Sequence, residues 1–145
     1  MGPSIDPVKE LAAIKAASIL DSDPADSRAV QQVCTVCHSS SQFLGTARSS
    51  SRWEQVFGEM AQRGAHPSDE QIDQIVRYFQ RNLTVINVNT SPLEELEPTL
   101  QISPETSTAI IMRRGQHKFT GIADLAAVPG IDRSVLIHLK DRLQF

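Results

Sequence analysis

The chain has 145 residues, with 14 Lys and Arg against 17 Asp and Glu, and its formal net charge is -3. Hydrophobic residues make up 40% and charged residues 21%, which excludes a wholly disordered chain and a long coiled coil. No apolar run approaches the ~18 residues that a membrane span needs, so we expect a soluble protein. The acidic balance gives the chain as a whole no attraction to nucleic acid.

The first half of the sequence predicts four helices. Apolar spacing over residues 7–20 predicts an amphipathic helix or a helical linker, and a second helix starts near Asp26 and leads into a pair of cysteines. The Ser-rich stretch 39–51 predicts a loop. Residues 53–63 carry apolar side chains three, four and seven apart, and a Ser-x-x-Gln capping box opens a helix over 68–81.

The second half predicts shorter helices joined by tight turns. Residues 83–90 are β-branched and contain Asn, which predicts a linker or a first turn. Ser-Pro pairs at 91–92 and 103–104 predict two helix starts, the first of them with a capping box. Further helices are expected over 122–127 and 132–143. The predicted fold class is therefore all-α, in two halves that join near the start of this linker.

The most informative motif is Cys34-Thr35-Val36-Cys37-His38. In a c-type cytochrome two thiols add to the two vinyl groups of haem, so they lie about one helical turn apart, and the following His supplies the proximal iron ligand. Because each of the three residues has its own chemical task, the motif predicts covalent haem attachment through Cys34 and Cys37 with His38 on the iron. A buried porphyrin also supplies apolar core to a domain of about 60 residues.

Three other interpretations of the two cysteines stay open at this stage. A thioredoxin-like redox pair needs a βαβ context, and no strand is predicted before the motif. A zinc site needs further ligands, and the chain offers only His66, His117 and His138 besides the motif. A structural disulfide across two residues is strained and rare. Haem attachment accounts for all three residues of the motif and is the interpretation we favour.

The second axial ligand has to come from another segment. Met60 lies on the apolar face of the helix over 53–63 and offers a soft thioether, whereas Met1 is terminal and Met112 lies in the other half. The alternative role of Met60 is that of an ordinary core methionine. His66 is the rival ligand and implies a lower reduction potential, because Met/His ligation raises it. An open or water-bound position is the third alternative.

Residues 22–83 resemble a small monohaem cytochrome c of the kind found in periplasmic oxidoreductases. The residues that carry the resemblance, besides the motif, are Trp53, Val56, Met60, Gly64-Ala65, Asp69-Glu70, Ile75 and Tyr78. The resemblance implies an electron carrier with Met60 as the distal ligand. It also implies export to the periplasm, because haem is attached outside the bacterial cytoplasm, and hence a removed signal segment. We assign residues 1–83 to a cytochrome c domain, with 1–21 as an N-terminal helix or linker.

Two aromatic residues of this domain are predicted haem contacts. Trp53 and Tyr78 either donate hydrogen bonds to the haem propionates or pack against the edge of the porphyrin.

Residues 84–145 resemble a ComEA-like tandem helix-hairpin-helix domain, found in bacterial competence proteins. The matching residues are Ile86-Asn87-Val88-Asn89-Thr90, Leu93-Glu94-Glu95-Leu96, Gln101-Ile102-Ser103-Pro104, Ala109-Ile110, Arg113-Arg114-Gly115, Phe119, Asp124-Leu125 and Val128-Pro129-Gly130-Ile131-Asp132. The resemblance covers nearly the whole span and implies its fold.

The hairpins of this domain depart from the form that binds DNA. That form is Gly-hydrophobic-Gly, which lets backbone N–H groups at a helix N-terminus approach phosphate. The first hairpin has Gln101 and Ser103 in place of both glycines, and the second keeps Gly130 but has Asp132. The span carries six Lys and Arg against seven Asp and Glu. A non-specific DNA binder depends on neutralising phosphates, so we expect this domain to dock a protein partner.

The sequence therefore predicts a periplasmic electron-transfer cytochrome c with one covalent haem c and its iron, whose partners are a redox protein donor and an acceptor. We expect it to be an electron carrier, or the cytochrome subunit of an oxidoreductase complex, because no motif indicates a substrate site with a paired acid and base. The alternative is a redox-linked, non-specific DNA-binding protein of the competence type.

Overall fold

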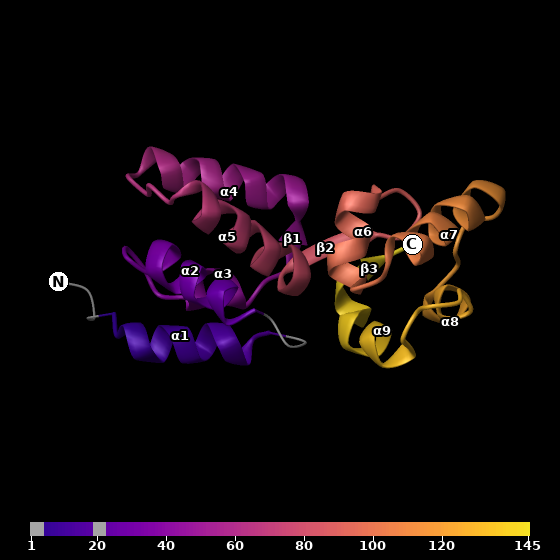
Figure 1. Cartoon of the computed structure of the whole chain (residues 1–145), viewed down its shortest axis with the longest axis horizontal. Helices are drawn as coiled ribbons and strands as arrows, with labels where there is room; N and C mark the ends of the chain where they lie inside the picture. The colour runs from indigo at the N-terminus through magenta and orange to yellow at the C-terminus, as the bar shows by residue number, and fades with distance from the viewer. Residues whose placement is uncertain (1–4, 19–22) are drawn as a thin grey trace. The chain divides into compact units, whose positions relative to one another are not determined.

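The computed structural model describes residues 5–18 and 23–145. It divides into two compact units, Met1–Leu83 (unit 1) and Thr84–Phe145 (unit 2), and the division falls where the composition of the sequence changes. The described residues are mostly helical, which confirms the predicted all-α class apart from short strands (Figure 1). Among these residues no helix is long and apolar enough to cross a membrane.

Unit 1 consists of five helices and a two-residue strand. They are α1 (Pro7–Ala16), α2 (Pro24–Cys34), α3 (Ser41–Leu44), β1 (Arg48–Ser49), α4 (Ser50–Gln62) and α5 (Asp69–Asn82). Asp6, Asp23, Ser49 and Ser68 each cap a helix by accepting a hydrogen bond from a first-turn N–H. The predicted capping box at Ser68 is present, with Gln71 completing it. α2 packs against both α1 and α5 (Figure 1).

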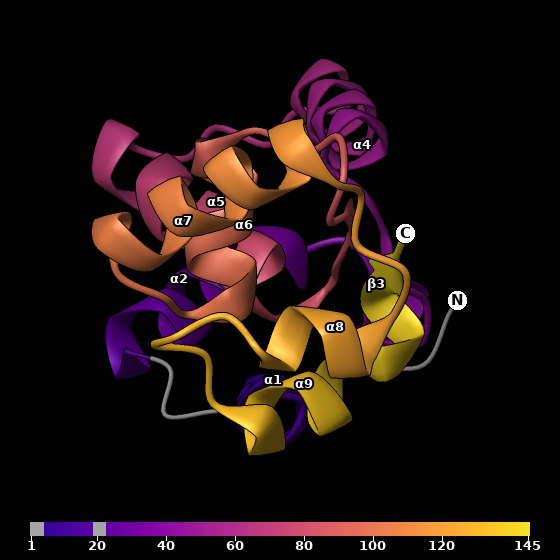
Figure 2. The same cartoon turned by 90° about the vertical axis from the view of Figure 1, so that its right-hand side faces the viewer.

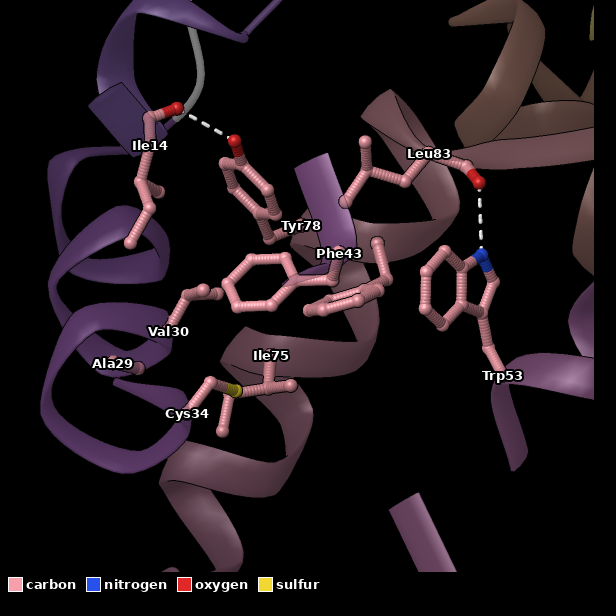
Figure 3. Close-up of a cluster of buried hydrophobic side chains, with 10 residues drawn as sticks. Ile14, Ala29, Val30, Cys34, Phe43, Trp53, Ile75, Tyr78 and Leu83 are labelled. Atoms are coloured by element: carbon pink, nitrogen blue, oxygen red, sulfur yellow. Dashed lines mark hydrogen bonds between the residues drawn. The ribbon is translucent and has the colours of Figure 1, made fainter. Parts of the chain in front are cut away.

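Helix α1 is part of the core of unit 1. The side chain of Ile14 is completely buried, and the Tyr78 hydroxyl of α5 donates a hydrogen bond of 2.5 Å to the Ile14 carbonyl oxygen (Figure 3). The helix ends at Ala16, four residues before the predicted end. Residues 1–4 and 19–22 of the predicted N-terminal helix or linker lie outside the described residues.

An aromatic cluster centred on Phe79 of α5 forms the middle of this core. The Phe79 ring lies 4.7 Å from the Trp53 ring, 5.0 Å from the Phe57 ring and 5.4 Å from the Phe43 ring, measured between centroids. The other buried members are Ile14, Ala29, Val30, Cys34, Ile75, Tyr78 and Leu83 (Figure 3). Edge-to-face and tilted contacts of this kind add to the stabilisation that burial of apolar area provides.

The loop predicted over residues 39–51 is wrong in part, because this stretch holds α3, β1 and the start of α4. Its Ser content indicated a loop, yet Ser49 caps α4 by accepting a hydrogen bond from the Arg52 N–H, and Ser40 precedes α3 without a side-chain capping bond. Phe43 is the apolar residue that fixes the segment, since its buried ring packs on Phe79.

Unit 2 contains two helix pairs, each joined by a short hairpin. Its elements are β2 (Thr84–Asn87), α6 (Leu93–Leu100), α7 (Pro104–Gln116), α8 (Ile122–Ala126), α9 (Arg133–Leu139), a 3₁₀ turn (Lys140–Arg142) and β3 (Leu143–Gln144). The first pair is α6 and α7, and the second is α8 and α9, which pack against one another (Figure 2). Leu96, Ile110, Leu125 and Leu136 are buried between them.

Two sequence predictions for unit 2 need correction. The last helix ends at Leu139 and not at Leu143, because Leu143 pairs with Ile86 in the parallel ladder between β2 and β3. The predicted capping box at residue 91 does not form: α6 starts at Leu93, and the Ser91 hydroxyl accepts a hydrogen bond from the Asn87 N–H at 3.0 Å. At Leu143 a partner distant in sequence replaces the local signal, and at Ser91 a local hydrogen bond with Asn87, four residues earlier, does so.

Candidate functional site

The Cys-x-x-Cys-His segment lies at the C-terminus of α2. Cys34 is the last helical residue and is buried, whereas Cys37 and His38 follow in a turn where Cys37 is exposed and His38 is half-buried. The turn is held by the Thr35 hydroxyl, which donates to the Gln31 carbonyl oxygen at 2.5 Å. The motif therefore stands at the edge of the core of unit 1, with one thiol turned inward and one at the surface.

A cavity of about 560 Å³ opens beside this turn. Both cysteines, His38 and Met60 all line it. Met60 comes from α4 and is half-buried, on the same helix face as Trp53 and Val56, which line the cavity too. The structure thus brings the sequence-predicted thiols, imidazole and thioether to the wall of one cavity.

A second cavity of about 310 Å³ adjoins the first, since both have Val33, Cys34, Met60 and Ala65 in their walls. Its remaining lining is apolar and comes from Phe57, Gly58 and Ala61 on α4, Pro67, and one face of α5. On that face Ile72 and Val76 keep 43% and 45% of their surface exposed. Apolar side chains on an amphipathic helix normally pack against a partner. The α5 face with Ile72 and Val76 is therefore open to contact with an apolar group.

Three arginines, Arg48, Arg52 and Arg63, also line the first cavity. The Arg48 guanidinium lies over the Trp53 ring, 5.7 Å from its centroid. Arg52 donates a hydrogen bond of 3.0 Å to Gln55 and lies 3.9 Å from the Glu59 carboxylate. The sequence predictions missed these arginines. No helical spacing marks them, because Arg48 lies in β1, Arg52 on α4 and Arg63 at the C-cap of α4.

The remaining predicted residues of unit 1 are placed differently from one another. His66 is exposed and lines a third cavity of about 270 Å³, which shares Cys37 and Arg63 with the first cavity but includes neither His38 nor Met60. Trp53 lines the first cavity, but its indole N–H donates to the Leu83 carbonyl oxygen at 2.8 Å. The Tyr78 hydroxyl bonds the carbonyl of Ile14, and its ring lies in the core rather than along the described cavity walls (Figure 3).

Burial raises the pKa of the Cys34 thiol to about 12, so this thiol is protonated and neutral at physiological pH. Its sulfur lies beside Ile75 (Figure 3). A thiolate nucleophile needs a lowered pKa, so the site is not built for thiol-disulfide chemistry at Cys34. Within residues 5–18 and 23–145, no group of three or more His, Cys, Asp and Glu side chains is placed to hold a metal ion.

In unit 2 the two hairpins use their special backbone positions for packing. Gln101 in the first hairpin has a φ of 55°, and Gly130 in the second has a φ of 93°. A side-chain Cβ at Gly130 would lie 2.3 Å from the Thr106 hydroxyl oxygen of α7. Glycine is required here because the two hairpins touch at this point.

The helix N-termini that follow the hairpins are capped by their own side chains. The Ser103 hydroxyl accepts from the Thr106 N–H at 3.2 Å, and the Asp132 carboxylate accepts from the Ser134 N–H at 2.9 Å. Hydrogen bonds from Ser134 lower the pKa of Asp132, which keeps it ionised. A carboxylate therefore occupies the position at α9 where a phosphate oxygen would accept these hydrogen bonds.

Half of the cations of unit 2, a unit that is described throughout, have internal partners. Arg113 bonds Asp124 at 2.8 Å, Arg114 donates to the carbonyl oxygens of Val88 and Ser91, and the buried Arg142 donates to that of Thr84. The other three, Lys118, Arg133 and Lys140, are exposed.

Residues 81–144 match the family model of the helix-hairpin-helix motif, which confirms the predicted fold of the second half at the level of this motif. The matched span contains none of the residues that line the three cavities of unit 1 described above. Neither a curated protein nor a solved structure matches the chain.

Proposed function

We propose that unit 1 is a c-type cytochrome domain that holds one haem covalently, and that the chain is an electron carrier. The observation that carries the proposal is that Cys34 at the end of α2, Cys37 and His38 in the turn after it, and Met60 on α4 line one cavity. Two thiols, an imidazole and a thioether are the four groups that haem c uses for its two thioether bonds and its two axial positions. The residues present fit the group.

The walls of the cavities support the same proposal. Their volumes of about 560 and 310 Å³ lie in the range of cofactor sites. Phe57, Ile72 and Val76 provide an apolar surface for a porphyrin face and exclude water from it. Arg48, Arg52 and Arg63 supply cations for the two propionate carboxylates.

Each proposed ligand has a distinct task. Cys34 and Cys37 would form thioethers with the haem. A thioether carries no charge, so the buried position of Cys34, which disfavours a thiolate, does not disfavour this bond. The His38 imidazole and the Met60 thioether would ligate the iron, and Met/His ligation raises the reduction potential. When bound, haem supplies an iron that gains or loses one electron. The residues of unit 1 hold it, orient it and set its potential.

The remaining parts of the proposal rest on the resemblance and on charge. The resemblance to periplasmic cytochromes supports a periplasmic location, where haem is attached. Unit 2 then serves as a docking module for the redox donor or acceptor, because its hairpins are packed and capped internally and its net charge is -1 from six cations and seven acids.

The test is to produce the chain together with a haem-attachment system and to measure its absorbance spectrum and intact mass. We expect one haem per chain, retained under denaturing conditions. Changing both cysteines to Ala abolishes the attachment. Met60→Ala changes the spectrum and lowers the potential, whereas the matched variant Met112→Ala, at an exposed position of unit 2, leaves both unchanged. A correctly processed chain without covalent haem overturns the proposal.

Nucleic-acid binding by unit 2 is a second candidate, and the match to the helix-hairpin-helix motif favours it. The exposed Lys118, Arg133 and Lys140 are the residues that would contact phosphates. The test is the fluorescence anisotropy of labelled duplex DNA at low salt. Binding that weakens steeply with salt and is lost when the three cations are changed to Ala supports this candidate. No binding at micromolar protein rejects it.

A further inference from the structure

The side chain of Glu10 on the N-terminal helix α1 contacts the segment that follows His38. Glu10 of α1 accepts a hydrogen bond from the Ser40 backbone N–H at 2.8 Å and a second from the Ser39 hydroxyl at 3.0 Å. The residues joined here are about thirty positions apart in the chain. Ser40 itself is buried. The contact is therefore a tertiary clamp on the backbone just after His38.

The peptide unit between Ser39 and Ser40 also contacts the His38 imidazole. The His38 Nδ1 atom lies 3.2 Å from the Ser39 carbonyl oxygen, which belongs to the peptide unit whose N–H bonds Glu10. A carbonyl oxygen can only accept, so in a neutral imidazole Nδ1 carries the proton and Nε2 keeps its lone pair. Phe43 restrains the ring further, with an edge-on contact between centroids 6.2 Å apart.

We propose that Glu10 is a positioning residue for His38, acting through the peptide unit between Ser39 and Ser40. The carboxylate on the N–H polarises the peptide, and the carbonyl becomes a stronger acceptor for the Nδ1 proton. This fixes the tautomer that leaves Nε2 free to ligate. It also makes Nε2 a stronger electron donor to a bound metal, as a carboxylate that bonds a ligating His directly does. The inference rests on the proposed haem site for its effect on potential, but not for its effect on the tautomer.

Two substitutions separate the parts of this role. Glu10→Gln keeps an oxygen that can accept from Ser40 but removes the charge, and Glu10→Ala removes the acceptor altogether. Glu54→Gln is the matched control, since it removes one carboxylate from an exposed position on α4.

The first measurement uses the haem-free full chain, labelled with ¹⁵N at His, at a pH where the imidazole is neutral. We expect the His38 tautomer with a protonated Nδ1 to dominate in the wild type and in Glu10→Gln, and a mixture of the two tautomers in Glu10→Ala. The amide N–H of residue 40 exchanges faster in Glu10→Ala. Wild-type tautomer populations in Glu10→Ala overturn the proposal.

The second measurement is the reduction potential of the haem-loaded chain. A stronger electron donor at Nε2 stabilises oxidised iron. Removing the charge of Glu10 is therefore expected to raise the reduction potential of the haem. At a fixed ambient potential we expect about a threefold higher ratio of reduced to oxidised protein in Glu10→Gln than in the wild type, and no such change in Glu54→Gln. Equal shifts in the two variants overturn the polarising role. If the chain takes no haem, the proposed function fails, and the tautomer populations still decide the role of Glu10.

Discussion

The two units differ in where their apolar surface goes. In unit 2 the buried apolar side chains of α6, α7, α8 and α9 pack against one another. A cavity of about 220 Å³ lies beside Arg113 and Asp124, and the exposed Met112 and Ile137 do not line it. In unit 1 the aromatic cluster fills one side of α5, while Ile72 and Val76 on the same helix stay exposed beside adjoining cavities of about 560 and 310 Å³. In unit 1 the exposed Ile72 and Val76 therefore line a cavity, whereas the exposed Met112 and Ile137 of unit 2 do not, and the proposed haem site would account for this difference.

The two units also differ in how deeply the carboxylate of an ion pair is buried. In unit 1 the Asp26 side chain is 1% exposed and takes two hydrogen bonds of 2.8 Å from Arg77. In unit 2 the Arg113 and Asp124 side chains are 37% and 22% exposed. A buried carboxylate depends on its partner far more than a solvated one does, so the α2–α5 contact next to the Cys-x-x-Cys-His segment is the more sensitive of the two.

The largest expected effect comes from the aromatic cluster of unit 1. We expect Phe79→Ala to lower the free energy of unfolding by about 4 kcal/mol, because Phe79 is 1% exposed and contacts three aromatic rings. The fluorescence of Trp53, the single tryptophan of the chain, reports the unfolding of this unit in denaturant.

Phe57→Ala is the matched control for Phe79→Ala. Phe57 belongs to the same cluster but lines the apolar cavity, so part of its surface has no protein contact in the haem-free chain. We expect a clearly smaller loss than for Phe79→Ala. Equal losses would show that the cavity side of unit 1 is packed as tightly as its core, against the contrast between the units.

The next effect compares the two arginines. Arg77→Ala leaves the buried Asp26 carboxylate without its partner, and we expect unit 1 to lose about 3 kcal/mol of unfolding free energy. Arg113→Ala removes a partly solvated pair and a contact over the Phe119 ring, and we expect unit 2 to lose about 1 kcal/mol. Trp53 fluorescence measures the first, and amide hydrogen exchange in α7 and α8 measures the second.

A control for the Asp26–Arg77 pair removes the charge of Asp26 as well. Asp26→Asn combined with Arg77→Ala leaves an uncharged amide in place of the stranded carboxylate, and we expect it to regain part of the loss. A double variant no more stable than Arg77→Ala alone contradicts an electrostatic origin of the cost.

Local signals in the sequence predicted most helices, because caps and apolar periodicity act within a few residues. Ser68 with Gln71 and the apolar face of the helix over 53–63 are examples. The predictions that were wrong involve a competing partner for the same residue. Ser91 bonds Asn87, four residues earlier, rather than capping α6, and Leu143 joins a ladder with Ile86, far away in the sequence, rather than extending α9. A pattern within one helix does not choose between such partners.

The candidate site was predictable in its chemistry and not in its walls. The Cys-x-x-Cys-His motif and the apolar periodicity of α4 are features of the sequence itself, and they pointed to Cys34, His38 and Met60. The arginines of the cavity wall and the Glu10 contact with Ser40 depend on how α4 and α1 lie against the motif. Charged residues at helix surfaces are common, so their sequence positions alone do not single out these members.

A smaller effect tests why unit 2 keeps one hairpin glycine. We expect Gly130→Ala to cost about 2 kcal/mol, because alanine is strained at a φ of 93° and its Cβ meets the Thr106 hydroxyl. Thr106→Ala removes that oxygen, so the cost of Gly130→Ala is expected to fall in the Thr106→Ala background. Thermal unfolding followed by circular dichroism gives the four free energies of this cycle. Strict additivity would mean that the glycine serves something other than contact between the hairpins, such as the approach of phosphate.

The smallest effect is the pH dependence at the cap of α9. Hydrogen bonds from Ser134 lower the pKa of Asp132 below its ordinary value of 3.8. A carboxyl group with a lowered pKa in the folded state contributes stability that is complete above its unfolded pKa and is lost as the pH falls through its folded pKa. We therefore expect the wild type to lose more unfolding free energy than Asp132→Asn as the pH is lowered from about 5 to 2, since Asn still caps the helix but does not titrate. Asp141→Asn, which removes another exposed carboxylate near the same end of the chain, should follow the wild type. Parallel curves of unfolding free energy against pH for the wild type and Asp132→Asn would mean that the charge of Asp132 does not stabilise unit 2. In that case the Asp132 carboxylate would not take the place of a phosphate at the N-terminus of α9.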